Sequence, residues 1–148
     1  MLIGIKGGSV MSGGLLPCFD YFREMNIWAL LLKLSLAVIF GGLIGLERGQ
    51  KHRAAGSRTY MLVGIGAVLT MMLSQYESYL LANNWAAISE AIGIKTDVSR
   101  FGAQVINGIG FLGAGTIIVT GRQEVKGLTT AAGLWASACM GLAIGAGF

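Results

Sequence analysis

Charged residues are scarce in this chain of 148 residues. They make up 12% of the sequence, against roughly 25% in typical soluble domains, whereas hydrophobic residues make up 54%. A water-soluble fold with so few polar side chains could not cover its own surface. The scarcity of charge therefore excludes an ordinary soluble domain and indicates a membrane protein.

Proline, cysteine and histidine are also scarce. One proline among 24 irregularly spaced glycines excludes a collagen-like chain. Cys18 lies in the N-terminal tail and Cys139 lies inside a long apolar run, which argues against a disulfide between them. His52 is the single histidine, and no Cys/His spacing resembles a metal site. Without a nucleophile–base pair or paired carboxylates in the apolar runs, we expect no catalytic centre, no metal site and no cofactor.

The net charge of +4 does not indicate nucleic acid as a partner. The basic residues are not interleaved with aromatic ones, and they lie beside apolar runs. Lysine and arginine in such places are typical of signals that orient membrane helices. We therefore expect the lipid bilayer as a partner, and no nucleic acid.

The sequence predicts an all-α fold, a polytopic bundle of transmembrane helices. A helix needs about 20 mostly apolar residues to cross the bilayer, and the apolar runs here show no strand-like alternation. The four predicted spans cover about residues 28–46, 60–76, 101–120 and 128–148. Residues 1–26 contain no such run, so we interpret them as an N-terminal extension before a membrane domain at 27–148.

The distribution of basic residues predicts the orientation of the bundle. The loop after the first span carries Arg48, Lys51, Arg53 and Arg58, and the loop before the last span is also basic. Short loops rich in lysine and arginine face the cytoplasm. The N-terminus is therefore expected outside.

The stretch GIGFLGAG at 108–115 matches the dinucleotide fingerprint G-x-G-x-x-G. That fingerprint needs a strand before the glycines and an acidic residue at the end of the next strand. Here an apolar run continues through the glycines, which favours close helix packing, or a bend that opens a polar site. Small residues also recur every four positions in the first and last spans. The predicted packing positions are Gly41, Gly45, Gly108, Gly110, Gly113, Gly115, Gly141 and Gly145. Whether these stripes meet within one chain or between chains stays open at this point.

Two charged residues near the first span have alternative interpretations. Lys33 lies six residues into the span, and we expect its long side chain to reach the membrane interface rather than an internal partner. Glu47 either forms an i,i+4 ion pair with Lys51 or is a buried carboxylate that meets an arginine or a cation.

Polar residues also mark the third and fourth spans. Arg100, Gln104 and Asn107 share one helical face, which predicts a hydrogen-bond ladder between helices or the lining of a polar pathway. Asp97 or its neighbour Thr96 is placed to cap that helix. Thr129, Thr130 and Ser137 are expected to bond to carbonyls of their own helix.

Several stretches together resemble the membrane domain of the MgtC/SapB family. They are GGLIGLERG at 41–49, RAAGSRT at 53–59, DVSRFGAQVINGIGFLGAGTII at 97–118 and KGLTTAAGLWASACMGLAIGAG at 126–147. The resemblance covers about residues 27–148 and suggests a natural start near Met25, or at Met11. Combining the polar residues with the family pattern, the candidate functional positions are Glu47, Arg48, Arg58, Asp97, Arg100, Gln104, Asn107 and Thr130.

The resemblance implies a multi-pass protein of the bacterial inner membrane. Family members are associated with adaptation to low magnesium, acid and host stress, and one well-known member binds and inhibits the F1Fo ATP synthase. A regulatory protein that contacts other membrane proteins, or its own copies in a homo-oligomer, is therefore expected. The alternative is a transporter or channel for Mg²⁺ or another ion. Members commonly have a fifth span and a C-terminal domain, so this chain is interpreted as truncated or as a short member.

Overall fold

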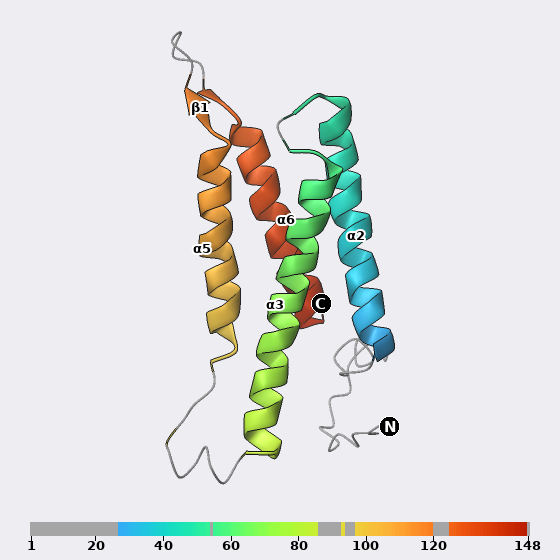
Figure 1. Ribbon diagram of the computed structural model, residues 1–148, viewed down its shortest axis with the longest axis vertical. Coiled ribbons are helices and arrows are strands. Elements are labelled where there is room, and N and C mark those ends of the chain that lie inside the picture. The colour runs from blue at the N-terminus through green and yellow to red at the C-terminus, as the bar shows by residue number, and fades with distance from the viewer. Residues whose placement is uncertain (1–26, 54, 86–92, 94–96, 120–124, 148) are drawn as a thin grey trace, which may run out of the picture.

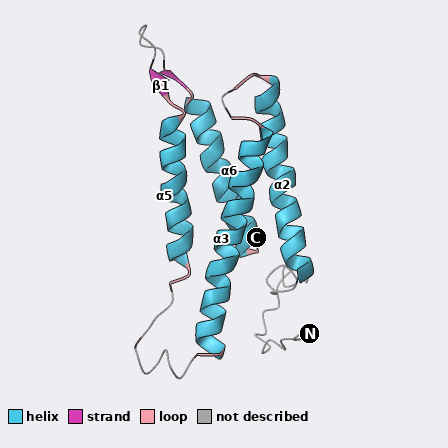
Figure 2. Cartoon of the chain, in the orientation of Figure 1, coloured by secondary structure: helices cyan, strands magenta, loops and turns pink. Residues whose placement is uncertain are grey.

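The computed structural model consists almost entirely of helices (Figures 1 and 2). It describes residues 27–53, 55–85, 93, 97–119 and 125–147. The elements in chain order are α2 (Ile27–Gln50), α3 (Ser57–Asn83), α5 (Ser99–Gly115), β1 (Ile118–Val119), β2 (Val125–Lys126) and α6 (Leu128–Ala146). The predicted all-α class is confirmed, while the predicted N-terminal extension at 1–26 lies outside the described residues.

Three of the helices are long and apolar enough to cross a membrane. They are α2 with 24 residues, α3 with 27 and α6 with 19. Helix α5 has 17 residues, which is about 25 Å at 1.5 Å per residue and shorter than a typical span. The bundle therefore contains three helices of spanning length, and α5 as a fourth span stays a prediction.

The predicted helix at 101–120 is wrong at its C-terminal end. Helix α5 stops at Gly115, and Ile118–Val119 pairs with Val125–Lys126 in a two-stranded antiparallel ladder. The glycines before this point weaken the helix, and the β-branched residues that follow favour extended backbone. The hairpin brings the end of α5 beside the start of α6 (Figure 1).

Helix α3 lies at the centre of the bundle, against both α2 and α6, while α5 packs mainly on α6. The contacts depend on small residues. A Cβ added to Gly41 of α2 would lie 2.8 Å from the Tyr60 carbonyl oxygen, and one added to Gly141 of α6 would lie 2.5 Å from the Gly64 oxygen. Both small-residue stripes therefore meet α3 within one chain, which answers the question that the sequence left open.

Two clusters of buried side chains fill the interior. One surrounds Tyr60 and Leu134, and the other surrounds Val68 and Ile144. Large apolar side chains also point outward on every helix, among them Leu62 with 68% of its surface exposed. Apolar surface on the outside of the bundle is what a lipid environment requires and what water would oppose.

Candidate functional site

Glu47 lies on the surface, at the end of α2. Its Oε1 atom is 2.6 Å from Nζ of Lys51, and 60% of the Glu47 side chain is exposed. The i,i+4 ion pair is therefore formed. The alternative of a buried carboxylate is wrong, because Glu47 falls on the side of α2 that faces away from α3.

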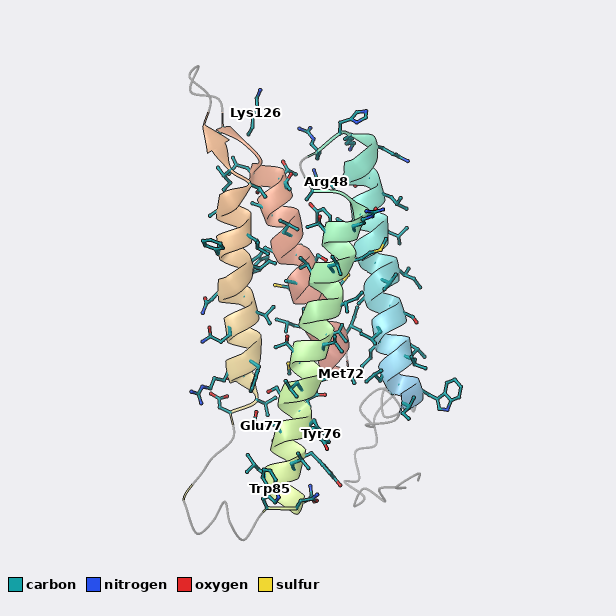
Figure 3. The ribbon with its side chains drawn as sticks, in the orientation of Figure 1. Arg48, Met72, Tyr76, Glu77, Trp85 and Lys126 are labelled. Atoms are coloured by element: carbon teal, nitrogen blue, oxygen red, sulfur yellow. The ribbon has the colours of Figure 1, made fainter. Side chains whose placement is uncertain are left out.

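Arg48, the next residue, is half-buried and turns towards the bundle (Figure 3). Its Nε atom is buried and has no hydrogen-bond partner among the described residues. The guanidinium lies close enough to interact electrostatically with Tyr60, whose hydroxyl donates to the Thr130 carbonyl oxygen at 3.4 Å. Arg48 and Thr130, two candidates from remote parts of the sequence, are thus brought to the same end of the bundle.

Tyr60 organises this end, and the sequence analysis did not identify it. Its side chain is fully buried, and a Cβ added to Gly133 would lie 2.7 Å from its hydroxyl oxygen. Its backbone carbonyl accepts a hydrogen bond from the Ser137 hydroxyl at 3.1 Å. The expectation that Ser137 bonds within its own helix is therefore wrong. A tyrosine at the start of an apolar span was the available signal.

A cavity of about 230 Å³ opens at the same end, between the α2–α3 loop and the α5–α6 hairpin. Its lining comes from both connections: His52, Arg53, Thr116, Lys126, Gly127, Thr129 and Thr130. Gly127, with φ +95°, allows the chain to turn into α6 directly against the Thr116 carbonyl oxygen. Arg58 is exposed at the start of α3 and is not part of this lining.

Asp97 caps the opposite end of α5. Its Oδ1 atom accepts hydrogen bonds from the Ser99 backbone N–H at 3.0 Å and from the Ser99 hydroxyl at 2.6 Å. The Ser74 hydroxyl of α3 donates to the Val98 carbonyl at 2.9 Å and holds this turn against the bundle. The Ser99 hydroxyl, followed by the Ser99 N–H, lowers the pKa of the Asp97 carboxyl below its ordinary value of 3.8.

This cap predicts a pH-dependent contribution to stability. A lowered pKa in the folded state stabilises the fold above the ordinary value and loses that contribution as the pH falls through the folded pKa. We expect Asp97→Asn to be less stable than the wild type at neutral pH, and the difference to shrink below pH 3.8. Unfolding of both proteins in detergent, followed by circular dichroism across this range, measures it. A difference that does not change with pH would contradict the role of the charge.

Arg100 and Gln104 line a second cavity, of about 350 Å³, together with Glu77 and Phe101. Within the described part of the chain, no hydrogen bond joins Arg100, Gln104 or Asn107 to another helix. The predicted ladder is therefore not formed in this chain. The reason is the rotation of α5, which buries Ile109 and Gly113 and leaves the polar face exposed.

The glycines of α5 are also divided between a side that packs on α6 and a side that is exposed. Gly113 packs on α6, with an added Cβ 3.4 Å from the Ala131 Cβ, whereas Gly108, Gly110 and Gly115 have no atom within 4 Å of an added Cβ. The close packing expected at these three positions does not occur among the described residues. The open face of α5, defined by Gln104, Asn107, Gly108 and Phe111, thus combines two amides with a glycine and an exposed aromatic side chain.

Lys33 has an internal partner, contrary to expectation. Only 2% of its surface is exposed, and its Nζ atom donates to the Gly145 carbonyl oxygen at 2.9 Å. Gln75 of α3 donates to the neighbouring Ala146 carbonyl at 3.2 Å. These carbonyls end α6 and have no partner within the helix. Lys33 therefore caps α6 instead of reaching the interface.

The comparison with protein families fits these observations. The family model described as "MgtC family" matches residues 34–148, which include α3, α5, α6 and most of α2. The chain belongs to the MgtC family. The described lining residues of both cavities lie within the matched region, and Lys33 lies one residue before it.

Named relatives give the same assignment. The MgtC-family chain is 41% identical over 117 residues to "Putative magnesium transporter YhiD" of Escherichia coli strain K12, covering 79% of this chain and 51% of that protein. It is 36% identical to Protein SapB of Bacillus subtilis strain 168, over 80% of this chain and 48% of SapB. It is 41% identical to Protein MgtC of Brucella abortus strain 2308, over 77% and 41% respectively. The chain thus spans about half the length of these curated relatives. No solved structure matches it.

Proposed function

We propose that this protein regulates other membrane proteins by direct helix contact, as part of bacterial adaptation to low magnesium, acid or host stress. We place it in the inner membrane with the N-terminus outside. The observation that carries the proposal is the open face of α5. Gln104 and Asn107 are exposed there, and Gly108 beside them has no neighbour within 4 Å.

The physical argument rests on the cost of exposing amides to lipid. An amide transferred to an apolar medium without a hydrogen bond costs roughly 2–7 kcal/mol. Lipid cannot supply that bond, whereas a polar helix from another protein can. Gly108 would let such a helix approach closely. The face therefore favours a protein neighbour over lipid.

The resemblance to the family suggests the F1Fo ATP synthase as the partner to test first. We expect the purified protein to inhibit ATP-driven proton pumping in inverted membrane vesicles, and Gly108→Leu to abolish the inhibition. A Cβ added at this position has no atom within 4 Å, so the variant should fold about as stably as the wild type, or more stably by up to about 1 kcal/mol through helix propensity. Acridine-dye quenching measures pumping, and thermal unfolding in detergent verifies the fold.

Gly66→Leu provides the matched control. Gly66 lies on an exposed part of α3 and also has no atom within 4 Å of an added Cβ. It should leave inhibition intact. Equal inhibition by the wild type and both variants would contradict a role for the α5 face, and no inhibition by the wild type would exclude this partner.

Ion transport is the second candidate, because one relative carries the name of a magnesium transporter. Mg²⁺ binds oxygen ligands, and the exposed Glu47 carboxylates of several copies could form a ring in a homo-oligomer. Mg²⁺ flux into proteoliposomes with an entrapped indicator tests this idea. Flux that Glu47→Gln removes would favour transport over regulation, and no flux from folded protein would leave regulation as the proposal.

A further inference from the structure

The cavity of about 230 Å³ between the α2–α3 loop and the α5–α6 hairpin has an unusual set of lining groups. Arg53 and His52 come from the first connection and Lys126 comes from the second, and none of the described residues that line the cavity is an aspartate or a glutamate. Lys126 and Arg48 mark this end of the bundle in Figure 3. A cavity lined by basic side chains from two connections is suited to an anion.

Neutral donors on α6 face the same space. Thr129 and Thr130 line the cavity, and Gly127 before them has no side chain with which to cap the helix. The first intrahelical bond that α6 makes at this end is from the Ala131 N–H to the Gly127 oxygen. Among the described residues, the N–H groups of 128–130 have no acceptor. A free N-terminal turn of a helix attracts negative charge and supplies donors to it.

We propose that this cavity binds a phosphate group. The Arg53 guanidinium presents a planar fork of N–H donors that matches two phosphate oxygens, and the α6 amides and the Thr129 hydroxyl can donate to the others. A carboxylate has two oxygens in one plane, whereas donors here approach from the loop on one side and from α6 on the other. A tetrahedral oxyanion uses both sides.

The phosphate can come from an anionic phospholipid headgroup or from a soluble phosphate compound. The cavity lies where the long apolar helices end, which is the depth of headgroups in a bilayer. The site is separate from the open face of α5, so it stands or fails independently of the proposed regulatory contact.

The test compares the full chain with Arg53→Gln and with the matched control Arg58→Gln. Both variants remove one exposed arginine from the same region, but only Arg53 lines the cavity. In the first arm, titration calorimetry in neutral detergent measures the affinity for inorganic phosphate, with sodium chloride at equal ionic strength as the blank. In the second arm, native mass spectrometry counts molecules of phosphatidylglycerol retained against phosphatidylcholine.

We expect Arg53→Gln to weaken binding about tenfold or more in one of the two arms, and Arg58→Gln to change it less than about twofold. An effect on inorganic phosphate assigns a soluble ligand, and an effect on phosphatidylglycerol alone assigns a lipid. Thr129→Val should weaken binding in the same arm. If both arginine variants behave alike in both arms, binding depends on general surface charge and the proposal is overturned.

Discussion

Gly141→Ala is expected to destabilise the folded protein by about 1–3 kcal/mol, although alanine is the better helix former. The added Cβ would lie 2.5 Å from the Gly64 carbonyl oxygen and 2.8 Å from the Ala67 Cβ. Neither neighbour can move without shifting the backbone of α3. Since α3 also holds α2, the strain reaches the centre of the bundle. Equilibrium unfolding in mixed detergent and SDS micelles measures the change, and Gly141→Val should cost more.

Gly66→Ala is the control for this prediction. The same methyl group is added to a helix, but at a position with nothing within 4 Å. It should be neutral or stabilise the protein by up to about 1 kcal/mol through helix propensity. If both alanine variants were equally stable, close packing of α6 on α3 would not limit stability.

Lys33→Glu is expected to cost about 3–5 kcal/mol, the largest effect among these predictions. The substitution replaces a buried donor by a carboxylate that faces the Gly145 carbonyl oxygen and the negative end of the α6 dipole. Lys33→Met, which keeps the volume but removes the donor, should cost about 1–3 kcal/mol because the carbonyl loses its partner. In the same unfolding assay, the stability should decrease from the wild type to Lys33→Met and further to Lys33→Glu. The first decrease measures the loss of the hydrogen bond, and the second measures the effect of the negative charge.

Lys51→Glu is the matched charge reversal on the same helix. Lys51 is 58% exposed and its ion pair with Glu47 lies on the surface, so its loss should cost less than about 1 kcal/mol. Equal effects of the two reversals would show that Lys33 is solvated and does not cap α6.

Local features of the fold followed directly from the sequence. The Glu47–Lys51 pair and the Asp97 cap join residues within four positions of each other, so helical geometry alone places them together. The sequence also revealed the all-α class, because long apolar runs in lipid must satisfy their own backbone groups. The end of α5 was misplaced because glycine and β-branched residues in an apolar run are compatible with more than one backbone conformation.

The sequence predicted some residues of the candidate site, but it did not predict how they are arranged. Arg48 and Thr130 were singled out, but Tyr60, which lies between them, was not, and Arg53 and Thr129 were not expected to share a cavity. The polar face of α5 was recognised, whereas its exposure was not. Each of these features depends on how one helix is rotated against another.

By itself, the sequence determined the environment of this protein, its helices and its family, since composition, hydropathy and local spacing act within one segment. Only the tertiary structure decided that Lys33 bonds to Gly145, 112 residues away, and that both glycine stripes meet α3. The physical reason is that the long apolar helices α2, α3 and α6 have no strongly polar face, so their hydropathy pattern does not show which side faces the interior and which side faces lipid. Their orientation is selected instead by which small residues allow two backbones to approach, and that is a property of pairs of helices.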